Sequence, residues 1–226
     1  NAIAPYIDTP LVKILAGVRR CGKSVLLRQI QTSRSERDYY INFDDERLLS
    51  FTVEDFQKLD ELFHEEFGEQ HTYYFDEIQN IDGWPLFVNR LLRQRIHLLI
   101  TGSNAKLLST ELASHLTGRH HKIELFPFSF KDWCVINDLD YTRLTTKNRG
   151  LLSKAYEDYF HQGGFPELLS GEENPKEYIS TLIDNIITQD IKKRYKIRNI
   201  DALKKLAHHI LNETPTIIVK DNLQDA

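Results

Sequence analysis

The stretch that decides the fold is residues 14–30, ILAGVRRCGKSVLLRQI. An apolar run leads into Gly17, and Gly22 follows after four residues, with Lys23 and Ser24 directly behind it. Glycine, four residues and then Gly-Lys-Ser is the complete pattern of a phosphate-binding loop, which stands between a strand and a helix. The residues after Ser24 are apolar at helical spacing, so the pattern has the setting that it requires. The sequence therefore predicts a nucleotide-binding loop.

Each residue type in this loop has a chemical reason. Gly17 and Gly22 let the backbone approach a phosphate closely, and the loop N–H groups then point at it together with the helix N-terminus. Lys23 can reach the β and γ phosphates of ATP, and the Ser24 hydroxyl is placed to ligate Mg²⁺. The alternative reading is a glycine turn followed by an accidental Lys-Ser pair.

A second motif, YYFDEIQN at residues 73–80, suggests what is done with the nucleotide. An apolar strand ends in Asp76 and Glu77, at the carboxyl end of a strand, where parallel sheets bind their ligands. We expect Asp76 to bind the Mg²⁺ through a water, and Glu77 to polarise a water against the γ phosphate. The alternative is two solvated acids that cap the next helix. An acid beside the metal-binding aspartate favours hydrolysis over transfer of the phosphoryl group to a metabolite.

Further polar residues are candidates for contact with the γ phosphate. The segment LLITGSN ends a strand expected beside the first one, so Thr101, Ser103 and Asn104 are candidates for sensing the γ phosphate or the attacking water. An arginine often stabilises the charge on that phosphate, sometimes from a neighbouring subunit, which leaves a homo-oligomer open. Arg119 is the first candidate and Arg194 the second, against the simpler reading of both as surface residues.

Apolar segments of strand length alternate with stretches of helical spacing, and this order predicts a parallel sheet with helices on both faces. After about residue 128 the pattern predicts helices only, with a break at Gly163, Gly164 and Pro166. The five predicted strands are 11–16, 38–43, 72–77, 97–102 and 121–126, and the later helices are 129–137, 150–162, 175–193 and 199–212.

The composition bounds the function. The 226 residues are 41% apolar and 27% charged, with a net charge of −4, so no global field would draw the chain to nucleic acid or to an anionic membrane. The apolar runs are too short to span a bilayer, and we expect a cytoplasmic protein without a membrane partner. Cys21 and Cys134 are too few and too far apart to predict a disulfide framework or a zinc site.

The motifs resemble, in order, those of the predicted AAA-type ATPases of bacteria and archaea. They are GVRRCGKS, NFDDERL, YYFDEIQN, ITGSNAKLLSTELASHLTGR, FPFSF, GGFPELL and DIKKRYKIRN. The resemblance covers nearly all of the chain. In that family the ATPase core is followed by a winged-helix segment and a further domain similar to nuclease folds. We expect the present chain to stop short of that last domain.

The resemblance implies a P-loop NTPase of the additional-strand class, an α/β fold with strand order 5-1-4-3-2. It implies an ATPase core at residues 1–137, a helical lid at 138–198 and the start of a winged helix at 199–226. Arg19 and Arg20 match paired arginines of the family's loop. The predicted nucleotide-binding residues are Gly17, Arg19, Arg20, Cys21, Gly22, Lys23, Ser24, Val25, Thr101, Ser103 and Asn104; the metal-binding residues are Ser24 and Asp76, and the catalytic residues are Glu77, Lys23 and Arg119.

The predicted function is an ATP-hydrolysing, Mg²⁺-dependent switch that couples its nucleotide state to a C-terminal output or nucleic-acid-binding region. One alternative is a module that holds ATP without turnover, and a weaker one is a P-loop kinase. The basic stretch from Lys192 to Arg198 is a candidate DNA contact; the other reading is a solvated helix end whose cations suit the helix dipole.

Overall fold

The computed structural model describes residues 6–7, 9–34, 38–103, 116, 118–143, 145–192 and 197–212. By its contacts the chain divides into two compact units, Asn1–Leu169 and Ser170–Ala226. The first unit contains the sheet and both motifs that carry the predicted chemistry. The predicted boundaries at residues 137 and 198 remain predictions.

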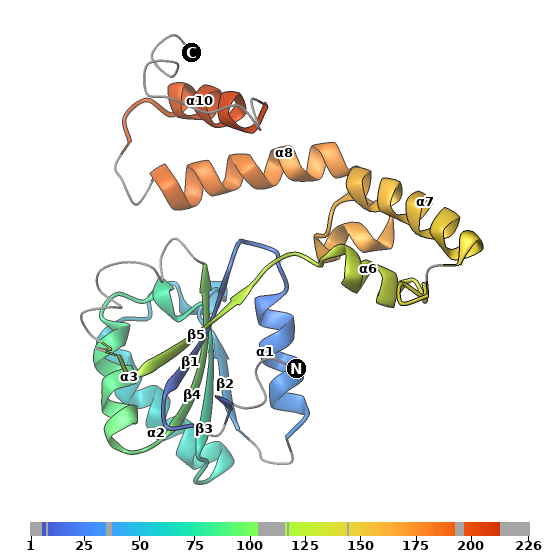
Figure 1. Ribbon diagram of the computed structural model, residues 1–226. Coiled ribbons are helices and arrows are strands. Elements are labelled where there is room, and N and C mark those ends of the chain that lie inside the picture. The colour runs from blue at the N-terminus through green and yellow to red at the C-terminus, as the bar shows by residue number, and fades with distance from the viewer. Residues whose placement is uncertain are drawn as a thin grey trace. The chain divides into compact units, whose positions relative to one another are not determined.

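A parallel sheet forms the centre of the first unit (Figure 1). Within the described residues its strands are β1 (Val12–Gly17), β2 (Tyr39–Asn42), β3 (Thr72–Asp76), β4 (His97–Ser103) and β5 (His120–Leu125). They lie in the order β2-β3-β4-β1-β5, and every pairing is parallel. The predicted order 5-1-4-3-2 is therefore confirmed. Because all pairings are parallel, the carboxyl ends of β1 and β3 lie at the same end of the sheet. The two predicted motifs follow these ends, with only β4 between them.

Helices cover the two faces of this sheet (Figure 1). Helix α1 (Lys23–Thr32) packs Leu27 and Ile30 against one face, and α2 (Phe56–Phe67) and α3 (Trp84–Arg93) pack on the other. Successive strand residues point to opposite faces, so Tyr74 joins the core under α1 while Phe75 joins the core under α2 and α3. The sheet is apolar on both faces, as parallel sheets are.

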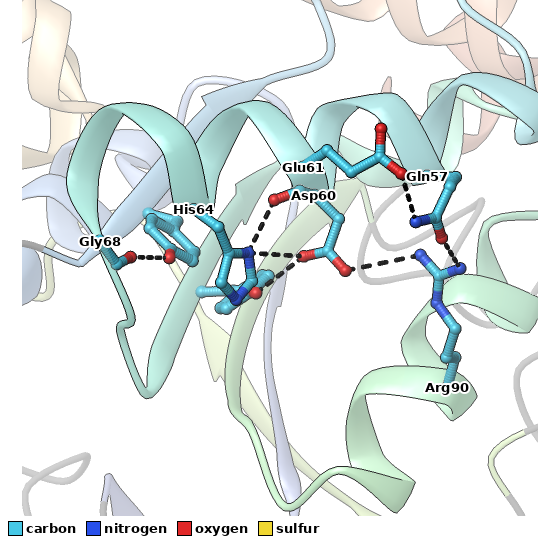
Figure 2. A network of polar contacts seen from close by, with 8 residues as sticks. Gln57, Asp60, Glu61, His64, Gly68 and Arg90 are labelled. Atoms are coloured by element: carbon cyan, nitrogen blue, oxygen red, sulfur yellow. Dashed lines mark hydrogen bonds and ion pairs between the residues drawn. The ribbon is translucent and has the colours of Figure 1, made fainter.

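A polar network ties α2 to α3 beside the sheet (Figure 2). Tyr73 donates its hydroxyl proton to Asp60 Oδ1 at 2.8 Å, and Arg90 Nη2 lies 3.7 Å from Asp60 Oδ2. Arg90 Nη1 also donates to Gln57 Oε1 at 2.6 Å. Burial and the contact with Asp60 raise the pKa of Tyr73. The network places one charged pair and two hydrogen bonds where the two helices meet the end of an aromatic core.

Helical segments follow the sheet, as predicted. They are α6 (Phe130–Ile136), α7 (Thr146–Gln162) and the short 3-10 helix η5 (Pro166–Ser170), and then α8 (Pro175–Asn185), the π-helical η6 (Ile186–Ile191) and α10 (Ile200–Asn212). Side chains of Ser129, Thr145 and Asn174 accept hydrogen bonds from the first turns of α6, α7 and α8. Half of the predicted winged-helix segment, residues 213–226, lies outside the described residues. None of the described helices is long and apolar enough to cross a membrane.

Candidate active site

The predicted phosphate loop, residues 17–24, joins the end of β1 to the start of α1. A Cβ added at Gly17 would lie 2.4 Å from the carbonyl oxygen of Leu125, far inside van der Waals contact. Gly22 has φ +93°, a left-handed conformation, and immediately precedes α1. Both positions of the motif therefore require glycine, one because β5 approaches it and one because of its backbone conformation.

Lys23 lies against the loop. Its side chain is buried, and Nζ donates to the carbonyl oxygens of Val18 at 2.9 Å and Gly17 at 3.2 Å. The ammonium charge thus lies in the loop where a phosphate would need it. Cys21 is buried beside it, and burial raises the pKa of the thiol. Val25, predicted to contact nucleotide, has 62% of its surface exposed.

The paired arginines differ in environment. Arg19 is half-buried, whereas Arg20 is exposed and has φ +63°, a left-handed backbone that is uncommon for a residue other than glycine. Arg20 Nη1 donates to Glu167 Oε2 at 2.9 Å. The ring of Pro166 lies 3.8 Å from the position that a Cβ on Gly22 would take. The start of η5 therefore contacts the phosphate loop.

Residues 163–169 are also anchored on the other side, at Phe128. The Phe128 N–H donates to the carbonyl oxygen of Gly164 at 2.7 Å, and the Tyr159 hydroxyl donates to the carbonyl oxygen of Phe128 at 2.8 Å. A Cβ added at Gly164 would lie 2.0 Å from that same oxygen. The break predicted at Gly163, Gly164 and Pro166 is thus a backbone contact that only glycine permits.

Asp76 is buried and accepts hydrogen bonds from three hydroxyl groups of three different elements. Ser24 Oγ donates to Oδ1 at 3.0 Å, and Thr101 Oγ1 donates to the same oxygen. The Tyr40 hydroxyl donates to Oδ2 at 3.1 Å. Burial and the Asp76 carboxylate raise the pKa of Tyr40 to about 12, so that hydroxyl is protonated at neutral pH.

Glu77 follows in a strained conformation, with φ +53°. Its N–H donates to Thr101 Oγ1 at 3.0 Å, and Gln79 Nε2 donates to Glu77 Oε2. Burial raises the pKa of the Glu77 carboxyl, while the charge of Lys23 opposes that shift. Thr101 was predicted to sense the γ phosphate; its hydroxyl is engaged with Asp76 and Glu77.

The residues present suit a magnesium ion. Ser24 and Asp76 offer a hydroxyl and a carboxylate oxygen that already meet at 3.0 Å, and Mg²⁺ prefers such hard oxygen ligands. A hydroxyl can donate its proton to a carboxylate and still offer a lone pair to a cation. Among the described residues, no cluster of three His, Cys, Asp or Glu side chains offers a separate metal site.

Arg119 does not lie near the phosphate loop of its own chain. It directly precedes β5, and its carbonyl oxygen accepts from the N–H of Val12, the first residue of β1. The loop follows the last residue of β1, so the length of the strand, about 20 Å, separates the two. Parallel pairing thus places Arg119 at the end of the strands away from the loop of its own chain, and its predicted catalytic role, which includes action from a neighbouring subunit, stays a prediction.

Other predicted residues are only partly described. Ser103 pairs with Gly17 in the register of β4 and β1, so its backbone lies beside the phosphate loop. Asn104 and Arg194 lie outside the described residues. Of the basic stretch, Lys192, Ile197 and Arg198 are described and residues 193–196 are not.

Two residues of the site were not among the predicted ones. The ring of Tyr40 is half-buried under Arg28, whose Cζ lies 3.2 Å from the ring centroid, and its hydroxyl donates to Asp76. Glu167 had no assigned role. Neither residue has a local signal, since each meets its partner only through tertiary structure.

Two family models match the chain, and two curated relatives align with most of it. A family model described as an AAA domain matches residues 9–134, and one described as a domain of unknown function matches residues 153–226. An uncharacterised protein of Methanocaldococcus jannaschii is 37% identical over an alignment of 207 residues that covers 89% of this chain and 46% of that protein. One of Haemophilus influenzae is 38% identical over 215 residues, 89% of this chain and 51% of that protein.

The chain spans about half the length of these two curated relatives. Among solved structures, domain III of the Thermotoga maritima replication initiation protein DnaA aligns with 83% of this chain and 89% of that domain, at 16% identity and a TM-score of 0.41.

Proposed function

Because the chain belongs to the AAA domain family, we propose that it binds ATP with Mg²⁺ at the phosphate loop and hydrolyses it. The observation that carries the proposal is the hydrogen bond from Ser24 to Asp76, which joins the two motifs of a P-loop ATPase. The buried Glu77 next to it supplies a carboxylate where hydrolysis needs a base.

The proposed roles follow from the contacts. Lys23 moves its charge from the loop carbonyls to the phosphates, and the loop N–H groups bind the same oxygens. Ser24 and Asp76 hold the magnesium ion, which when bound neutralises charge on the phosphates. Glu77 orients the attacking water and accepts its proton. Thr101 positions both acids through its single hydroxyl.

A second candidate function is a module that holds ATP without turning it over. It is favoured by the contact of Glu77 with Gln79, which engages the carboxylate oxygen Oε2. A P-loop kinase has less support, because it would not need Glu77.

Steady-state ATP turnover and ATP binding should be measured for wild type, Lys23→Ala and Glu77→Gln. The hydrolase loses turnover in both variants, and Glu77→Gln keeps its affinity for ATP. Tight ATP binding without turnover by the wild type, across protein concentrations and with or without double-stranded DNA, would instead establish the nucleotide-holding module. Absence of ATP binding would overturn both.

We also propose that nucleotide binding is coupled to the chain beyond residue 169 through Arg20 and Glu167. The phosphates of ATP bring negative charge to the loop that holds Arg20, and they compete with Glu167 for its guanidinium group. An exposed ion pair contributes at most about 1 kcal/mol, so Glu167→Gln should raise ATP affinity by up to about 5-fold. Glu157→Gln, an exposed change on α7, is the matched control. Equal affinities in both variants and wild type would remove Glu167 from the coupling.

We propose that Arg119 acts on the nucleotide of another copy of the chain, because it lies at the start of β1 and not at the loop that follows β1. This role requires a homo-oligomer in which the phosphate loop of one copy faces the residues before β1 and β5 of the next. The basic residues from Lys192 to Arg198 are the proposed DNA contact. Titration of labelled double-stranded DNA at two salt concentrations tests that contact, since phosphate binding weakens steeply with salt.

A further inference from the structure

We propose that Tyr40 is a positioning residue of the metal site, because its hydroxyl fixes the orientation of the Asp76 carboxylate. The inference rests on the proposed function and deepens it, since the hydrogen bond from Tyr40 sets how tightly the site holds Mg²⁺ together with ATP. No motif of the sequence suggests this role for a tyrosine of β2.

Three hydroxyl groups from three elements bond the Asp76 carboxylate. Ser24 donates to Oδ1 at 3.0 Å, and Thr101 donates to the same oxygen. Within the part of the chain that the structure describes, the donor to Oδ2 is the Tyr40 hydroxyl, at 3.1 Å. The two oxygens of a carboxylate have about four acceptor positions together. Asp76 can therefore accept from all three hydroxyls and also from a water bound to the metal ion.

The hydrogen bond to Oδ2 determines how the carboxylate is turned. The last torsion of an aspartate side chain is broad, so hydrogen bonds to Oδ1 alone would leave the second oxygen free to swing around the first. A donor on Oδ2 removes this freedom and holds the carboxylate plane in one orientation. Groups that orient metal ligands in this way are worth about 10- to 100-fold in metal affinity. The Tyr40 hydroxyl therefore affects the ion without contacting it.

Tyr40 is itself held in place, as an orienting group must be. It lies in β2, which pairs with β3 in a register that places Tyr40 opposite Tyr74 and Asn42 opposite Asp76. From that position the side chain extends along the sheet toward the carboxylate. Arg28 of α1 covers the half-buried ring, with Cζ 3.2 Å from the centroid. The ring is therefore bounded by the sheet and by the helix that follows the phosphate loop.

The test is Tyr40→Phe, which deletes only the hydroxyl and keeps the ring beneath Arg28. A fluorescent ATP analogue is titrated into the protein, first with EDTA and then at increasing MgCl₂, and the half-saturating MgCl₂ concentration is recorded. We expect this concentration to rise about 10-fold or more. The affinity without metal should equal that of wild type, since Lys23 and the loop N–H groups bind the phosphates without the ion. Saturating MgCl₂ should restore tight binding.

Tyr39→Phe is the matched control, because Tyr39 is the preceding residue of β2 and its hydroxyl donates to the carbonyl oxygen of Gly68, between α2 and β3. Its MgCl₂ requirement should equal that of wild type. If Tyr40→Phe weakens binding equally with EDTA and with MgCl₂, its hydroxyl has only a structural role. That result, or an unchanged MgCl₂ requirement, overturns the inference. If wild type shows no metal-dependent binding of the analogue, the proposed function itself fails, which is a separate outcome.

Discussion

The hydroxyl of Ser24, in the first turn of α1, donates to Oδ1 of Asp76, the last residue of β3, at 3.0 Å across 52 residues of sequence. Thr101 of β4, the strand between β1 and β3, donates to the same carboxylate oxygen. Side chains of α1, β4 and β2 thus converge on one acid at the end of β3.

Thr101→Val should cost stability and turnover together. The substitution is nearly isosteric, but it removes the hydroxyl of the fully buried Thr101 and so leaves the part-buried Glu77 N–H without its acceptor. A buried group deprived of its partner costs about 1–3 kcal/mol. Urea unfolding measures the free energy, and steady-state kinetics measure the turnover. Thr101→Ser keeps the hydroxyl and should remain closer to wild type in both; equal losses in the two variants would mean that the methyl group, and not the hydroxyl, matters.

Gly17→Ala should lower the free energy of unfolding and weaken ATP binding. The added Cβ would lie 2.4 Å from the Leu125 carbonyl oxygen and 2.8 Å from Cys21 Sγ, so the loop must move away from β5. Overpacking of this kind costs about 1–3 kcal/mol. Gly150→Ala, in α7, has no atom within 4 Å of the new Cβ and should stabilise by about 0.5–1 kcal/mol. Thermal unfolding should show a lower melting temperature for Gly17→Ala and a higher one for Gly150→Ala than for the wild type. Destabilisation by Gly150→Ala would contradict this account.

Asp60→Asn should destabilise the contact between α2 and α3 modestly, and Asp60→Ala more. Asparagine still accepts from the Tyr73 hydroxyl but loses its charge opposite Arg90, at about 1 kcal/mol or less. Alanine also leaves the Tyr73 hydroxyl without its acceptor, which adds about 1–3 kcal/mol. Urea unfolding measures both, with Glu65→Gln on the exposed side of α2 as the control. The same loss for asparagine and alanine would show that the charge dominates.

Arg119→Ala should lose ATP turnover, and mixing this variant with Lys23→Ala should restore part of it. Lys23→Ala has no functional phosphate loop but still carries Arg119, so in a mixed assembly it can supply the arginine to a neighbour that lacks its own. An equimolar mixture should therefore turn over more ATP than the mean of the two variants measured alone. Arg95→Ala, at the exposed entry to β4, serves as the control and should need no rescue. An unchanged rate in Arg119→Ala would exclude the residue from catalysis altogether.

Residues that act through local spacing were predictable from the sequence. Gly17, Gly22, Lys23 and Ser24 are fixed by one loop, and Asp76 and Glu77 by the end of one strand, so a pattern of a few residues was enough to find them. The strand order also followed, through the family resemblance. These features depend on the chain close to each motif or on an architecture that the motifs identify.

Tyr40, Glu167 and Arg119 show where that reasoning stopped. The reach of Tyr40 to Asp76 depends on the register between β2 and β3, and the pairing of Glu167 with Arg20 joins residues 147 positions apart. Arg119 was placed correctly before a strand, but its distance from the loop depends on which end of that strand lies beside β1. The chemistry of the side chains suggested the candidate residues. The pairing and register of the strands decide which of these residues contact one another.

The hydrogen bond between Phe128 and Gly164 has an evolutionary consequence. It joins the two ends of the segment 128–164, which contains α6 and α7. The chain therefore leaves the sheet and returns to the phosphate loop from neighbouring positions. Insertions or deletions within that segment need not disturb its ends, since loops closed at their base tolerate changes in length. Among relatives, α6 and α7 should therefore vary in length more freely than the glycine and the phenylalanine that close them.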